Sequence, residues 1–302
     1  MSQLIQLRQR ILSIKKTCKI TRAMRLMSMS LYSKLEKQSV AISRYRKRIT
    51  TLFSEISLYA PDWKNQVLFP EDILDSNPLL IIVTSSKGLC GGFNSQLTRY
   101  FEENFFLEEH QKPTFVTIGK KGQDYLIRKN LINIAKHYDE LSSANIVDIS
   151  QDITDLMNAA PIPFSSVTLY ANTIKNFFVQ LPVKKPLIPL PIELHTNDST
   201  QTAEQQDTTA TSTTFEEEPI WEQRKEEVMD FVGTTFLKSL LLNALLESLL
   251  AEQAARFMAM DHSTTNAEKY LEKLTRQYNK SRQARITSEV AELSAGFSQV
   301  RT

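Results

Sequence analysis

The residues best suited to phosphate chemistry form one glycine-rich stretch, Ser85-Ser86-Lys87-Gly88-Leu89-Cys90-Gly91-Gly92-Phe93-Asn94. It follows an apolar run and precedes a helical pattern, and a strand–glycine turn–helix unit can hold phosphate at the helix N-terminus. The glycine spacing matches neither the dinucleotide fingerprint nor the P-loop, and Lys87 precedes the glycines where a phosphate-binding lysine would follow them. The pattern therefore favours a tight turn with close backbone packing over nucleotide binding.

Other groups that carry chemistry are scattered. Cys18 and Cys90 form no CxxC pair, which favours a reducing compartment and two packed thiols. Asp148, Asp152 and Asp155 share one predicted helix face, where acids are usually solvated. The histidines form no metal-ligand cluster: His110, His137, His195 and His262. The sequence therefore predicts no catalytic residue, no cofactor and no metal ligand.

The segment 78–195 must position the glycine turn, and its pattern is that of alternating strands and helices. Predicted strands are 79–84, 114–119, 131–135, 166–170 and 177–181; predicted helices are 97–109, 122–129 and 146–159. Its charge is balanced, with eleven basic and eleven acidic residues. Strands that alternate with helices predict a doubly wound, Rossmann-like α/β domain.

The N-terminal segment reads as one helix over 3–59, since residues 1–59 contain no glycine and no proline. Such a helix would be roughly 85 Å long. Residues 1–60 carry thirteen basic and two acidic residues. Three partners could explain this cationic helix: nucleic acid, a membrane surface or an acidic protein surface. Stacking aromatics are few and the apolar stripe is narrow and lacks tryptophan, so the acidic protein surface is favoured.

A second long helix is predicted from Pro219-Ile220-Trp221 to about Ala295. Its apolar stripe continues through Ala267, Leu271, Leu274 and Tyr278, and then through Ile286, Val290, Leu293 and Phe297. The polar segment 279–285 interrupts it, so that segment is either a solvated flank or a contact with something outside the coiled coil. Two helices longer than the domain between them should pair antiparallel.

This organisation divides the chain into five parts: an N-terminal coiled-coil helix (1–60), a connector (61–77), a Rossmann-like α/β domain (78–195), an acidic threonine-rich loop (196–218) and a C-terminal coiled-coil helix (219–302). The loop carries six acids and no base, a composition that favours flexibility. The most apolar segment, 236–251, is too short to span a bilayer, and no signal peptide is recognisable. We therefore expect no membrane crossing.

Three blocks resemble the gamma subunit of the F-type ATP synthase. They are IKKTCKITRAMRLM at 14–27, VTSSKGLCGGFNS at 83–95 and MAMDHSTTNAEKYLEKLTRQYNKSRQARITSEVAE at 258–292. They occur in the family's order and spacing. The resemblance covers nearly the whole chain and is most specific in the third block.

The resemblance implies a central-stalk rotor that couples ion flow to ATP synthesis or hydrolysis without catalytic residues of its own. Expected partners are the alpha and beta subunits, the epsilon subunit and the c-subunit ring, with no nucleic acid and membrane contact only through the complex. The expected location is the cytoplasmic face of a bacterial plasma membrane.

The resemblance also suggests two sets of contact residues. Beta subunits would meet cationic and polar side chains on the two helices: Lys15, Lys16, Lys19, Arg22, Arg25, Arg282 and Gln283. The glycine turn would serve assembly with epsilon or the c ring through Lys87, Gly88, Leu89, Cys90, Gly91, Gly92 and Asn94. The alternatives are a basic coiled-coil nucleic-acid-binding or scaffold protein, and a nicotinamide-dependent oxidoreductase.

Overall fold

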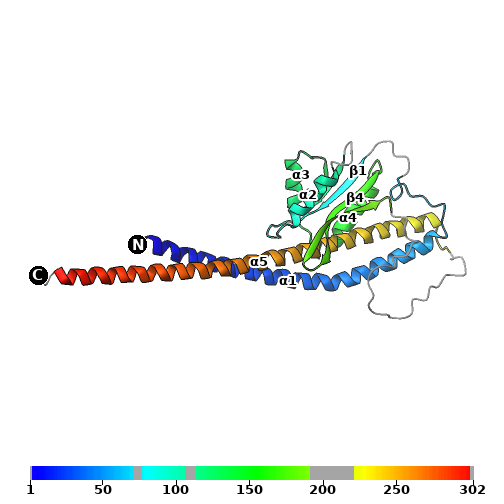
Figure 1. The fold of residues 1–302 in the computed structure, drawn as a ribbon. Coiled ribbons are helices and arrows are strands. Elements are labelled where there is room, and N and C mark those ends of the chain that lie inside the picture. Colours follow the sequence, from blue (N-terminus) through cyan, green and yellow to red (C-terminus); the bar gives the residue numbers. More distant parts are fainter. Residues whose placement is uncertain (1, 71–76, 106–112, 191–220, 300–302) are drawn as a thin grey trace. The chain divides into compact units, whose positions relative to one another are not determined.

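The computed structural model describes residues 2–70, 77–105, 113–190 and 221–299, so the predicted loop 196–218 lies outside the described residues (Figure 1). The chain forms two compact units. Unit 1 comprises Met1–Tyr32, Leu89–Gly91 and Gln253–Thr302, and unit 2 comprises Ser33–Gly88 and Gly92–Glu252. Two long helices, α1 (Ser2–Ser57) and α5 (Lys225–Gln299), contribute to both units.

Unit 2 is built on a five-stranded sheet with the order β3-β2-β1-β4-β5. Its strands are β1 (Pro78–Val83), β2 (Thr114–Ile118), β3 (Ile134–Tyr138), β4 (Ser166–Asn176) and β5 (Val179–Ile188). The first four are parallel and β5 is antiparallel to β4. Every residue of the central strand β1 is buried, as its continuous apolar run predicts. The Rossmann-like prediction is confirmed.

Three helices connect the parallel strands: α2 (Phe93–Phe105), α3 (Lys120–Arg128) and α4 (Ile146–Asn158). Right-handed crossovers place α2 and α3 on one face of the sheet and α4, which returns past β1 to β4, on the other. The first face closes over Phe101, whose ring lies 5.0 Å from that of Tyr170 and 6.3 Å from that of Tyr125. On the second face, Lys238 of α5 bonds Gln151 of α4.

Three predicted strands differ from the observed ones in position or length. The third strand begins at Ile134 rather than Leu131 because Asn130, at φ 58°, ends α3 and the Leu131 amide returns to the Leu126 carbonyl. Strands β4 and β5 form a hairpin longer than predicted, closed by the Asn176 side chain, which accepts the Phe178 and Val179 amides. The prolines of β5 are tolerated because β5 is an edge strand.

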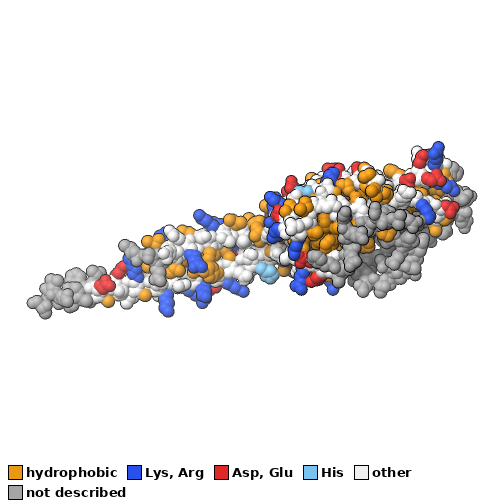
Figure 2. Space-filling model, turned by 90° about the horizontal axis from the view of Figure 1, so that it is seen from above, with side chains coloured by type: hydrophobic (Ala, Val, Ile, Leu, Met, Phe, Trp, Pro, Cys, Tyr) orange, Lys and Arg blue, Asp and Glu red, His pale blue; other side chains and the backbone are white. Residues whose placement is uncertain are grey.

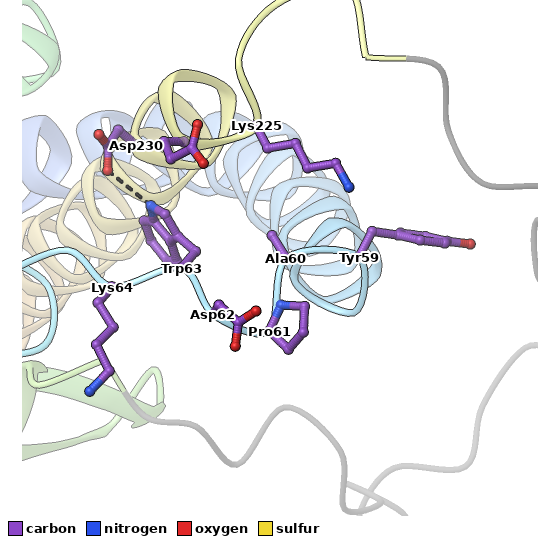
Figure 3. A pocket seen from close by; sticks show the side chains of 9 residues that line it. Tyr59, Ala60, Pro61, Asp62, Trp63, Lys64, Lys225 and Asp230 are labelled. Carbon is purple, nitrogen blue, oxygen red and sulfur yellow. Dashed lines mark hydrogen bonds between the residues drawn. The ribbon is translucent and has the colours of Figure 1, made fainter.

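The connector packs against the start of α5 in unit 2 (Figure 3). Trp63 donates its indole N–H to Asp230, and its ring lies 6.2 Å from that of Phe53, which stacks on Phe236 at 4.9 Å. A Cβ atom on Gly233 would lie 3.0 Å from the Trp63 ring, so the close approach requires glycine. Helix α5 begins at Lys225, later than the predicted start near Pro219.

In unit 1, α1 and α5 pair antiparallel, as predicted (Figure 1). Residues later in α1 contact residues earlier in α5, as in an antiparallel pair. The Arg10 guanidinium lies 5.5 Å from the Tyr270 ring centroid, and Arg25 further along α1 donates to Asp261. Leu274 is buried and Leu271 half-buried, which confirms the first half of the predicted stripe.

Candidate functional site

The paired helices of unit 1 meet along a seam that contains hydroxyl groups. The Thr21 and Thr264 hydroxyls are 2.8 Å apart, and both residues are buried, as are Cys18 and Ser28. Each threonine hydroxyl also lies within hydrogen-bond distance of a carbonyl of its own helix, that of Cys18 for Thr21 and that of Met260 for Thr264, and the bond between the two hydroxyls favours this register. The seam therefore holds the flanking side chains at defined positions.

Two of the arginines predicted to meet beta subunits form ion pairs with α5. Arg22 lies 2.5 Å from Glu268, and Arg25 lies 2.6 Å from Asp261. The Arg22 and Glu268 side chains are about half exposed, so this pair stabilises the fold by roughly 1 kcal/mol at most. Its main effect is to hold the guanidinium against α5.

The three lysines of the same set are exposed on α1. Lys15, Lys16 and Lys19 are exposed, and no described acid lies within ion-pair distance of them. Exposed apolar side chains stand among them on α1, including Leu12 (52% exposed) and Ile20 (59%). Figure 2 shows Lys and Arg side chains (blue) exposed together with hydrophobic ones (orange) on the visible face of these helices. A partner for this surface needs both acidic and apolar groups.

The set on α5, Arg282 and Gln283, is exposed, as predicted for a contact with something outside the coiled coil. Ile286 (49% exposed) and Val290 (60%) do not pack on α1, contrary to the second half of the predicted stripe. The reason is length: Tyr270 already lies opposite Arg10, so α5 runs beyond the first residues of α1. Arg285 pairs with Glu289 along α5 and leaves Arg282 without a described acid.

The residues of the glycine turn belong to both units: Leu89–Gly91 to unit 1 and the others to unit 2. In unit 2, the Asn94 side chain accepts the Ser85 amide and donates to the Ser85 hydroxyl, while Lys87 lies 3.4 Å from Glu140. In unit 1, Leu89 (φ 66°) is 58% exposed and Cys90 is buried. A Cβ atom on Gly91 (φ 59°) would lie 3.6 Å from that of Ala259 on α5, whereas Gly88 has open space and Gly92 faces Gln96.

The start of α3, a second glycine-containing strand–helix turn, is occupied by Thr84. Gly122, in the first turn of α3, donates its amide to the Thr84 hydroxyl at 2.8 Å. Gly119 has φ 90°, and a Cβ atom there would lie 2.1 Å from the Thr84 carbonyl oxygen. With Thr84 bound at this helix terminus, phosphate has no room to approach the amides. This geometry opposes phosphate binding at the start of α3, whereas the predicted glycine turn at 85–94 precedes α2 and stays a prediction.

Titratable groups in the α/β domain form structural pairs. Lys129 and Tyr125 both bond Glu102, and the Lys129 hydrogen bond holds the pKa of that carboxyl below its ordinary value. Burial, followed by the Glu102 bond, raises the pKa of Tyr125, away from the range of a base at neutral pH. His137 bonds Thr117 and Asp139, and no metal-ligand cluster occurs among the described residues.

A hollow of about 400 Å³ lies where the connector meets α5 (Figure 3). It is lined by Tyr59, Ala60, Pro61, Asp62, Trp63, Lys64, Lys225, Glu226 and Asp230. The Asp230 carboxylate accepts hydrogen bonds from the Trp63 indole and, at 2.7 Å, from the Asn65 side-chain amide. These bonds fasten the connector to α5 and assemble no nucleophile with a base.

Helix α5 is long and apolar enough to span a membrane by length and composition, but 56% of its most apolar window is buried in the structure. In unit 2 its buried residues include Phe236, Leu241 and Leu245. Burial of this kind fits a helix that packs on a sheet. The expectation that the chain does not cross a membrane stays a prediction.

Sequence reasoning missed the acids that bind the predicted arginines, Asp261 and Glu268. They are ordinary polar positions of the third motif block, and their role depends on the register between two segments more than 230 residues apart. Pairing α1 and α5 through their buried threonines could have found them. The two acids could be assigned to their arginines only after the register between α1 and α5 was known.

Comparison with known proteins places the chain in context. The sequence profile of a family described as ATP synthase matches residues 3–300. The ATP synthase gamma chain of Bartonella tribocorum is 30% identical over 98% of this chain and 99% of its own length. That of Geobacter metallireducens is 30% identical over the full length of both.

Solved structures share the fold. A chain of the Euglena gracilis mitochondrial ATP synthase, in a structure of its OSCP/F1/c-ring, matches with a TM-score of 0.65 and 16% identity, over 99% of this chain and 95% of that chain. A chain of the rotor of the same enzyme matches with a TM-score of 0.63 and 19% identity, over 94% and 99%.

Proposed function

The chain belongs to the family of ATP synthase gamma chains, and we propose that it turns as the central shaft of an F-type ATP synthase. In this role it couples ion flow through a membrane ring to ATP synthesis or hydrolysis at sites carried by other subunits. The proposal includes the absence of catalytic residues of its own.

The observation that carries the contact proposal is the free cationic surface on α1. Lys15, Lys16 and Lys19 are exposed without a described acid beside exposed apolar side chains. We assign these lysines, with Arg282 and Gln283 on α5, to contacts with beta subunits. Arg22 and Arg25 then act through Glu268 and Asp261, by holding the face in place.

Rotary coupling requires that contacts between shaft and head change in free energy with each rotational state. Long-range charge attraction between the lysines and an acidic surface would supply a term that depends on angle and on salt. The other proposed partners are alpha subunits, the epsilon subunit and a ring of c subunits. This assembly implies a peripheral location on the cytoplasmic face of a bacterial plasma membrane.

The test is assembly of the purified chain with alpha and beta subunits of the same source, followed by MgATP hydrolysis. A stable complex with several-fold higher turnover than alpha and beta alone is expected. A triple variant, Lys15→Glu with Lys16→Glu and Lys19→Glu, should lose most of this stimulation.

The matched control carries the same charge change in the α/β domain, on exposed lysines: Lys120→Glu, Lys121→Glu and Lys175→Glu. It should keep the stimulation. Equal losses of stimulation in the two triple variants would show a general charge effect and would remove the α1 lysines from the proposed contact. A chain that forms no complex but shifts duplex DNA in a salt-sensitive way would replace the rotor proposal by nucleic-acid binding.

A further inference from the structure

Strand β3 forms one edge of the sheet in unit 2. It pairs with β2 on one side, and no described strand lies on its other side. Native proteins commonly guard such an edge with a lysine that projects over the unpaired backbone. Here the lysine is held away: Lys136 donates to Asp152 at 2.9 Å and lies 5.4 Å from the Tyr138 ring centroid. Among the described residues, no second strand pairs with the outer backbone groups of β3.

An apolar hollow of about 520 Å³ adjoins this edge. It lies between β3 and α4 and is lined by Ala135, Lys136, Asp152, Asp155, Leu156, Ala159, Ala160, Pro161 and Phe164. Large apolar side chains stand exposed near both parts of the lining: Ile132 before β3 (73%) and Ile162 after α4 (55%). Exposed apolar area next to an open strand edge is typical of an interaction surface.

Acidic side chains of α4 beside the hollow favour a partner segment that carries a basic residue. Asp148 and Asp155 lie on the α4 face that carries Asp152, and no described cation lies within ion-pair distance of either. Asp155 accepts only a neutral hydrogen bond, from Gln151 at 2.8 Å. An incoming segment would gain a charge-assisted contact if it carried a lysine or arginine beside its apolar residues.

We propose that the β3 edge and its hollow bind an extended segment of a partner protein, which adds to the sheet as a sixth strand next to β3. An apolar side chain of that segment fills the space between Ala135, Leu156 and Phe164. A basic side chain reaches Asp155. The backbone bonds supply affinity, and the hollow and the acid supply selectivity.

The inference rests on the proposed function in one respect, since the partner is taken to be another subunit of the assembled complex. The experiment compares hydrogen exchange of the full chain alone and in that complex. Amides within 132–138 should exchange more slowly in the complex, by on the order of tenfold or more. Amides of α3, which lies on the face of the sheet opposite α4 and the hollow, serve as the internal reference.

Two variants test the chemistry of the segment. Asp155→Lys reverses the rim charge and should abolish the added protection of β3, while the melting temperature of the isolated chain stays unchanged. Glu103→Lys is the matched control: Glu103 is an exposed acid on α2 whose pair with Arg99 is itself exposed. This control should keep the protection.

The outcomes are distinct. A complex that forms while β3 exchanges as fast as in the free chain overturns the inference and leaves the rotor proposal intact. Protection already present in the free chain, rising with its concentration, would assign the edge to a second copy and also overturn it. Failure to form any complex would overturn the proposed function, and with it the partner on which the inference rests.

Discussion

Gly119 allows a close backbone approach to Thr84 at the start of α3. Its backbone has φ 90°, and a Cβ atom at this position would lie only 2.1 Å from the Thr84 carbonyl oxygen. Gly119→Ala should therefore destabilise the chain by roughly 3 kcal/mol or more, because strain and backbone clash act together. Denaturant unfolding measures this loss.

The matched control is Gly88→Ala in the glycine turn. A Cβ atom there has nothing within 4 Å. The free energy of unfolding should change by about 0.5 kcal/mol or less. Equal effects of the two substitutions would contradict the assignment of Gly119 to a close backbone crossing.

Glu102 gives a pH-dependent contribution to stability. Hydrogen bonds from Lys129 and Tyr125 lower its pKa in the folded chain below the ordinary value of 4.5. A carboxyl with a depressed folded pKa stabilises the fold above its unfolded pKa, and this contribution disappears as the pH falls through the folded value. Wild type should therefore melt at a higher temperature than Glu102→Gln at pH 7, with the gap narrowing below about pH 4.5. A gap independent of pH would assign the effect to packing.

At the residue scale, sequence reasoning could identify cationic positions but could not tell free charges from bound ones. Lys15 and Arg22 belong to the same motif block, yet Lys15 is solvated and Arg22 bonds Glu268. The difference arises from the antiparallel register, which a linear pattern does not contain. The same limit hid the Thr84–Gly122 bond that fills the start of α3.

At the element scale, long periodic segments were predictable and short irregular ones were not. The extent of α1 and the burial of β1 follow from uninterrupted apolar patterns. Strand β3 was misplaced because an edge strand carries little apolar periodicity. Strand β5 was cut short because prolines normally end a strand, although an edge position accepts them.

The part of α5 beyond its pairing with α1 carries the second predicted contact. Arg282→Ala with Gln283→Ala should slow ATP hydrolysis by the assembled complex, because both side chains are exposed there without a described acid. The expected loss is several-fold, on the order of 1 kcal/mol in activation free energy.

The same residue pair occurs earlier on α5 as Arg276 and Gln277, and it provides the control. Arg276 bonds Glu272 within the helix. Arg276→Ala with Gln277→Ala should leave turnover close to that of wild type. Similar losses in both double variants would indicate a general effect on the helix rather than a specific contact.

At the scale of the whole molecule, the doubly wound sheet combines a glycine turn that matches neither nucleotide fingerprint with a start of α3 that Thr84 occupies. Saturating ATP, ADP or NAD should therefore leave the melting temperature of the isolated chain unchanged, since a ligand stabilises a protein only by binding its folded state. A shift that rises with nucleotide concentration and survives Gly88→Ala would reopen the nucleotide interpretation.

Both long helices cross the boundary between the two units without a break. The boundary falls between Glu252 and Gln253 on α5 and between Tyr32 and Ser33 on α1, inside continuous α-helix in each case. Neither crossing contains a glycine or a proline at which a helix could bend sharply. Twist imposed on either helix at this point is therefore shared among many hydrogen-bonded turns, so that each helix behaves locally as an elastic rod.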